Sequence, residues 1–187
     1  ASAVTGNRNN AFGYLAGEDL TSGTNNVFMG SYSGKGISTG ISNTVCGEAA
    51  LITETSGDKN TAIGAEALKA QNGGRDGNVA VGYYAGFALT TGAENTILGT
   101  EAMSLNAVTG SKNVAVGYRA GKNLTTGDGN VIIGKSAGAD TTLLTTGTQN
   151  IVIGPLARTS AADVNNEIVI GYNLGGVGEG QASIGNG

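Results

Sequence analysis

Apolar residues occur in this chain as short runs of about three, each preceded by a polar residue and followed by glycine. The unit is Asn, three mostly apolar residues and Gly. In nine copies it begins with Asn9, Asn26, Asn43, Asn60, Asn78, Asn95, Asn113, Asn130 and Asn150. Two later copies, starting at Glu167 and Gln181, lack the Asn. The glycines that close the units are Gly13, Gly30, Gly47, Gly64, Gly82, Gly99, Gly117, Gly134, Gly154, Gly171 and Gly185.

The run between Asn and Gly predicts a strand. Its residues are rich in β-branched side chains, and no copy holds an apolar 3.6-residue period longer than one turn. After each Gly come a small residue and a turn rich in Thr, Ser and Gly, as in Thr125–Gly127. Strands repeated at a regular period stack as a parallel β-solenoid that rises about 4.8 Å per coil. We therefore predict an all-β solenoid of about eleven coils, mostly of 17–18 residues.

The repeats extend over the whole chain of 187 residues, so we expect a single repeat domain, 1–187. Residues 1–25 form a weaker first coil, 26–165 hold the regular coils, and 166–187 form atypical last coils or a cap. Copies differ in whether the segment after Gly ends in Gly, as at Gly86, or in Leu or Met, as at Leu68. Two coil geometries or simple duplication of two ancestral copies would explain this difference.

The strands are apolar on both faces, which predicts association. Val131–Ile133, Ile151–Ile153 and Ile168–Ile170 are continuous apolar runs, and such strands are buried on both sides. One face can fill the coil, and the other requires a partner chain. Small middle residues such as Ala62, Ala80 and Ala115 would let partner strands approach closely around an axis. We therefore expect a parallel homo-oligomer, a trimer in preference to a dimer.

The Asn residues at the strand starts have two interpretations. Their amides could form a structural ladder from coil to coil and satisfy the backbone of the turns. Alternatively, they could point outward as an array that binds a ligand. The ladder is favoured because each Asn adjoins an apolar strand.

Composition excludes several classes of function. The chain has no His, so it lacks an imidazole base and a histidine metal ligand. Cys46 is the single cysteine and is expected to be a buried hydrophobe. Ten Lys and Arg against fourteen Asp and Glu, with no basic run, argue against nucleic acid as a partner. No apolar stretch is long enough to insert into a membrane.

Three kinds of residue remain as candidates for chemistry. Glu48, Glu66 and Glu101 could act as paired carboxylates of a glycosidase, but their nearly equivalent repeat positions are typical of scaffolding. The turns 73–77 and 127–129 resemble calcium-binding Gly-Asp turns, although such a turn needs no ion, and we expect no cofactor. Tyr83 and Tyr118 follow strand-closing glycines, where they would either contact glycans or shield coil edges. We expect no catalytic residue and no metal site.

The repeat resembles a known family. Asn60–Gly64 with Ala67 and Leu68, and Asn113–Gly117 with Ala120, are similar to the head repeats of trimeric autotransporter adhesins, and still more to repeats of phage tail fibres and tailspikes. The resemblance implies a left-handed parallel β-roll, three intertwined chains and attachment to a cell surface. It places the chain on a virion or outside a cell, with a surface glycan or protein as receptor.

The sequence therefore favours a non-enzymatic structural and adhesive fibre segment. A self-assembling extracellular filament, a polysaccharide-cleaving tailspike and an ice-binding solenoid are the alternatives. Ice binding requires a flat array of threonines, and Thr44, Thr61 and Thr96 are interrupted by Val79 at the equivalent position.

Overall fold

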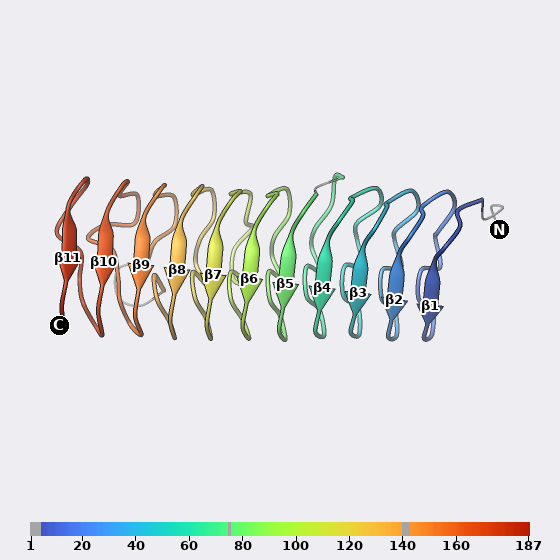
Figure 1. The fold of residues 1–187 in the computed structure, drawn as a ribbon, viewed down its shortest axis with the longest axis horizontal. Coiled ribbons are helices and arrows are strands. Elements are labelled where there is room, and N and C mark those ends of the chain that lie inside the picture. The colour runs from blue at the N-terminus through green and yellow to red at the C-terminus, as the bar shows by residue number, and fades with distance from the viewer. Residues whose placement is uncertain (1–4, 75, 140–142) are drawn as a thin grey trace.

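The computed structural model describes residues 5–74, 76–139 and 143–187. Within these residues the chain forms one parallel sheet of eleven strands in sequence order, and it contains no helix. It is thus a β-solenoid of about ten turns, with the N- and C-termini at opposite ends of a rod (Figure 1). The strands are β1 (Asn10–Phe12), β2 (Val27–Met29), β3 (Thr44–Cys46), β4 (Thr61–Ile63), β5 (Val79–Val81), β6 (Thr96–Leu98), β7 (Val114–Val116), β8 (Val131–Ile133), β9 (Ile151–Ile153), β10 (Ile168–Ile170) and β11 (Ala182–Ile184).

Each strand pairs with the next in strict register. Val114 lies beside Val131 and Ala115 beside Ile132, so equivalent residues of the repeat form columns along the rod. The register survives changes in coil length, because Val131 pairs with Ile151 and Ile168 with Ala182. Insertions and deletions are therefore confined to the turns between strands, where they do not shift the columns.

The middle residue of the strand points into the coil. It is buried in β2 to β10, and the residues on either side of it are half-buried or exposed. The small middle residues Ala62, Ala80 and Ala115 are therefore covered by their own chain. The expectation that they would lie on a shared axis between chains was wrong, because the middle position of the strand faces the interior of its own coil, where Ile97 and Ile132 are also buried.

Close stacking of the coils explains the strand-closing glycines. Gly117 has a φ of 130°, and a Cβ at this position would lie 2.7 Å from the backbone oxygen of Gly134 in the next coil. The same contact recurs along the column, where Gly47 meets Gly64. A side chain at these positions would separate neighbouring coils and would be strained in this backbone region.

The two kinds of copy share a left-handed backbone conformation at this position. Leu68 has a φ of 51° and Gly86, at the same position of the next coil, has a φ of 61°. The bend at this position is therefore not confined to the copies that carry Gly. The difference lies in core volume: a Cβ on Gly86 would lie 2.9 Å from side-chain atoms of both Leu68 and Ile97. The glycine makes room for larger neighbours in adjacent coils.

Cys46 also differs from its expected place. As the last residue of β3, it lies on the outer face of the sheet and is half-buried. Its column contains Met29 and Ile63, which are 50% and 38% exposed. The thiol is thus part of the apolar outer face, and Val45 beside it is the buried residue of that strand.

Candidate functional site

The Asn side chains form a continuous ladder inside the rod. The backbone N–H of each Asn from Asn26 to Asn150 donates to the side-chain oxygen of the preceding Asn, at 2.9–3.0 Å. The side-chain amides of Asn26, Asn43, Asn95, Asn113, Asn130 and Asn150 also donate to that oxygen, at 3.0–3.2 Å. A second amide hydrogen reaches a turn carbonyl, as from Asn113 to Gly127. These side chains point inward from Asn26 onward, so they do not form an array on the surface.

Glu167 occupies the next position of this ladder, and the sequence alone did not identify its role. It is fully buried, and its backbone N–H donates to the Asn150 side-chain oxygen at 2.9 Å. A carboxylate cannot donate onward in the way that an amide does. Instead its oxygens accept from the backbone N–H groups of Ser160 and Gly178. Glu167 therefore has different hydrogen-bond partners from the Asn residues of the ladder, at the point where the coils become atypical.

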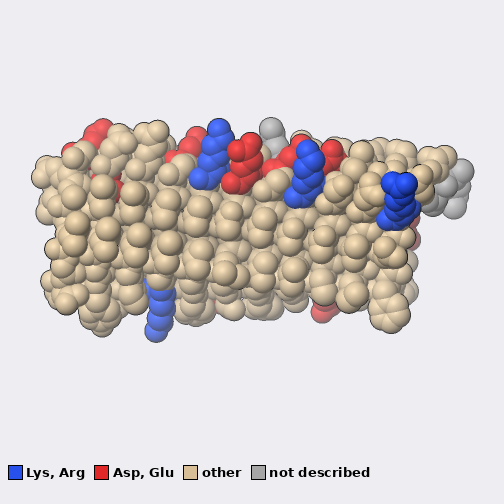
Figure 2. Space-filling view, in the orientation of Figure 1, with Lys and Arg blue, Asp and Glu red and all other residues tan. Residues whose placement is uncertain are grey.

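The outer face of the sheet is uncharged from end to end. In the eleven described strands, the residues that flank the middle position include no Asp, Glu, Lys or Arg. Several are strongly exposed: Phe12 is 79%, Leu98 47% and Ile184 75% exposed. Figure 2 shows a side of the rod on which uncharged side chains extend along the whole length, while charged ones gather mainly along one long edge. We call the outward residues of β1 to β11 the apolar sheet face.

The two tyrosines singled out by sequence have different surroundings. Tyr83 contacts Tyr84, with ring centroids 4.2 Å apart, and Tyr84 stacks on Phe87 at 4.7 Å. The interaction with the Tyr83 hydroxyl, followed by burial, raises the pKa of Tyr84 to about 12. Tyr118 lies two coils away, under the guanidinium of Arg119 at 4.8 Å from the ring centroid. Of these two tyrosines, Tyr83 belongs to an aromatic cluster and Tyr118 pairs with a cation.

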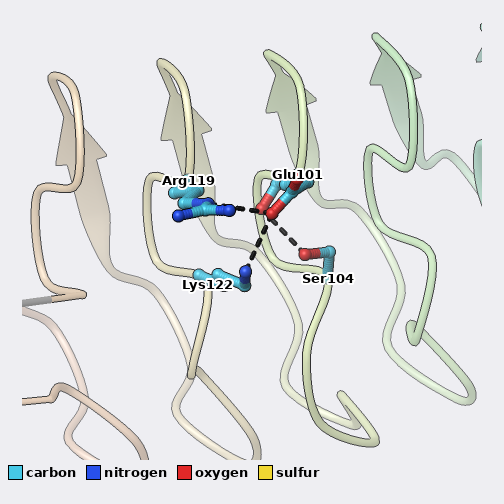
Figure 3. Close-up of polar contacts among 4 residues, drawn as sticks. All are labelled: Glu101, Ser104, Arg119 and Lys122. Atoms are coloured by element: carbon cyan, nitrogen blue, oxygen red, sulfur yellow. Dashed lines mark hydrogen bonds and ion pairs between the residues drawn. The ribbon is translucent and has the colours of Figure 1, made fainter.

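Glu101, Ser104, Arg119 and Lys122 form a polar cluster (Figure 3). Three of them, Glu101, Ser104 and Lys122, border the same hollow as these aromatic rings. One oxygen of Glu101 accepts from Arg119 Nε and Lys122 Nζ, both at 2.8 Å. The Ser104 hydroxyl donates to the Glu101 backbone oxygen at 2.9 Å. The hydrogen bond from Arg119, reinforced by that from Lys122, holds the pKa of the Glu101 carboxyl below its ordinary value of 4.5. Glu101 thus forms ion pairs with two cationic side chains from the next coil.

Glu66, Asp76 and Asp128, three of the remaining acidic candidates, also have partners. Lys69 contacts Glu66 at 2.9 Å, so two of the three proposed glycosidase carboxylates are in ion pairs. In the suggested calcium turns, Asp76 accepts from the Asp58 backbone N–H at 2.8 Å and Asp128 from that of Ser111 at 2.6 Å. Across the described residues, His, Cys, Asp and Glu nowhere form a group of three that could hold a metal ion. Gly-Asp turns act here as links between coils.

Comparison with known proteins adds no identification. No family model matches the chain, and neither a curated protein nor a solved structure is detectably similar to it. Within the described residues, no helix is long and apolar enough to cross a membrane.

Proposed function

We propose that the chain is a structural and adhesive segment of a fibre that gives reach and attaches to a cell surface, on a virion or outside a cell. In this proposal three copies lie parallel, their coils wind in the left-handed sense, and the apolar sheet faces meet around a common axis. The observation that carries the proposal is the apolar sheet face, which has no charged residue in any described strand.

The length of this face argues for a partner of the same length. Eleven strands spaced about 4.8 Å apart extend for roughly 50 Å. An uncharged and largely apolar surface of this extent is unusual on a monomer and is typical of an interface. A second copy in parallel has the same length and the same absence of charge. The resemblance of the repeat to trimeric fibre repeats supports three chains rather than two.

The mass in solution tests the assembly. We expect light scattering to give about 55 kDa for the wild type, three times the chain mass of 18.4 kDa. Leu98→Asp places a charge on the apolar sheet face, where Leu98 is 47% exposed, and should give a folded monomer. Thr146→Asp is the matched control, because Thr146 is an exposed residue of a turn outside the strands. A wild type that stays monomeric at micromolar concentration would overturn the proposed assembly.

Attachment is tested separately. Labelled wild-type protein should bind to the surface of a susceptible cell type, and unlabelled protein should compete with it. Saturable binding supports the adhesive role. An assembled trimer that binds no cell in a broad panel would restrict the function to a spacer.

A further inference from the structure

A hollow lies on the surface of the rod beside Tyr83, on the coils that begin with β5, β6 and β7. Its volume is about 330 Å³, and its lining includes Tyr83, Phe87, Ser104, Leu105 and Lys122. Phe87, Ser104 and Lys122 occupy the same repeat position in three successive coils. Their column therefore has a small residue between two large ones. Coils spaced about 4.8 Å apart place the outer two roughly 10 Å from each other, which is room for one sugar ring.

The two sides of the hollow differ in chemistry. One side is aromatic: Tyr83 is 52% exposed and leads to the stacked pair of Tyr84 and Phe87. Leu105, which is 57% exposed, adds apolar surface. The other side carries Lys122 and the Glu101 carboxylate. An exposed aromatic surface beside hydrogen-bonding groups suits a ligand with an apolar face and a polar edge, and a pyranose ring has this character.

The charges around the hollow favour some classes of saccharide over others. Glu101 is the shared partner of Arg119 and Lys122, so cations outnumber carboxylates in this cluster by two to one. An ammonium group has three donors, and the described structure assigns one donor of Lys122 to Glu101. Lys122 therefore retains donors for a ligand anion at the rim of the hollow. This local excess of positive charge contrasts with the chain's formal net charge of −4.

We propose that this hollow binds an acidic saccharide, with the sugar ring against Tyr83 and its carboxylate at Lys122. The inference rests on the proposed function, because it names the class of surface ligand that an adhesive fibre would contact. It also separates the two tyrosines: Tyr83 lines the site, and Tyr118, paired with Arg119, does not.

The test compares acidic saccharides with neutral counterparts of the same size. The first pair is a tetrasaccharide of alternating glucuronic acid and N-acetylglucosamine and its carboxyl-reduced form. The second pair is sialyllactose and its carboxyl-reduced form. Calorimetric titration of the full chain at low salt should show one acidic member binding about tenfold more tightly than its neutral partner. Failure of both acidic members to bind, or equal binding within each pair, would overturn the proposal.

Variants locate the binding. Tyr83→Ala and Lys122→Gln should each weaken the binding of the acidic saccharide about tenfold, with circular dichroism unchanged. Tyr172→Ala is the matched control, because Tyr172 also follows a strand-closing glycine and is 57% exposed. Tyr172→Ala should bind the acidic saccharide with the affinity of the wild type. Equal losses in Tyr83→Ala and Tyr172→Ala would place binding on tyrosines in general and contradict the assigned site.

The failures of the two proposals remain distinguishable. Wild type that attaches to cells but binds neither acidic saccharide retains the adhesive function and loses this site. Wild type that binds an acidic saccharide through Tyr83 but attaches to no cell retains the site and loses the adhesive function.

Discussion

The side-chain nitrogen of Asn130 donates to the side-chain oxygen of Asn113 in the adjacent coil, with an N–O distance of 3.1 Å. The same oxygen accepts from the Asn130 backbone N–H at 2.9 Å. The Asn113 amide in turn donates to Asn95 and to the backbone oxygen of Gly127. Four hydrogen bonds thus use every donor and acceptor of one buried side chain. Only an amide at this length supplies two donors and two acceptors in this arrangement.

Asn113→Ala should be strongly destabilising, because it leaves the backbone N–H and one amide hydrogen of Asn130 and the backbone oxygen of Gly127 buried and unpaired. We expect the free energy of unfolding to fall by about 3 kcal/mol or more, at about 1–3 kcal/mol per unsatisfied group. Chemical denaturation followed by circular dichroism measures this loss. Asn106→Ala, at an exposed position, is the control and should change stability little. Equal losses in the two variants would contradict a stabilising ladder.

The order of elements could be predicted from sequence because it depends on local pattern. A run of β-branched residues between Asn and Gly, as at Val131–Ile133, predicts a strand whatever lies around it. Repetition of that run then predicts parallel stacking, and the sheet order confirms it. Contact between successive Asn side chains could also be predicted, because in-register coils place equivalent residues side by side.

The choice of buried face could not be predicted, because both faces of strands such as Ile151–Ile153 are apolar. Alternation gives no preference when both sets of side chains are hydrophobic. The hollow beside Tyr83 was not predicted either, since it depends on Phe87, Ser104 and Lys122 from three coils. A comparison of side-chain size down each repeat column would have revealed the small Ser104 between its larger neighbours.

The pairing of Leu68 with Gly86 predicts energetic coupling between adjacent coils. Leu68→Ala should lower the free energy of unfolding by about 2–5 kcal/mol, because it leaves a cavity. Gly86→Ala should also destabilise, because its Cβ would lie 2.9 Å from Leu68 Cδ2 and Ile97 Cδ1. In the double variant the first substitution removes one of these clashes. Denaturation of the wild type, the two single variants and the double variant measures this coupling. The double variant should lose at least 0.5 kcal/mol less free energy of unfolding than the two single variants lose together. Strict additivity would contradict the coupling.

Ser42 predicts a stabilising substitution. It has a φ of 62° and is exposed, and its backbone N–H donates to the Thr24 oxygen at 3.0 Å. This left-handed conformation costs an ordinary residue about 1–2 kcal/mol, and glycine loses about 0.5–1 kcal/mol through its greater freedom when unfolded. Ser42→Gly should therefore raise the free energy of unfolding by about 0.5 kcal/mol. Ser42→Ala retains the strain and should give no gain in the same denaturation experiment; a larger gain from Ala than from Gly would refute this explanation.

Glu101 predicts a dependence of stability on pH. Arg119 and then Lys122 hold the pKa of its carboxyl below the ordinary value of 4.5, so the ionised form is favoured in the folded chain. A lowered pKa stabilises the fold above the unfolded value, and the contribution is lost as the pH falls through the folded value. The wild type should therefore be more stable than Glu101→Gln at pH 7, and the difference should shrink as the pH falls below 4.5. Because the cluster is partly exposed to solvent, 1 M salt at pH 7 should shrink the difference too. Thermal melts of both proteins at pH 7 and pH 3, with and without salt, measure this; a difference that persists unchanged at pH 3 would assign the effect of the substitution to packing and not to charge.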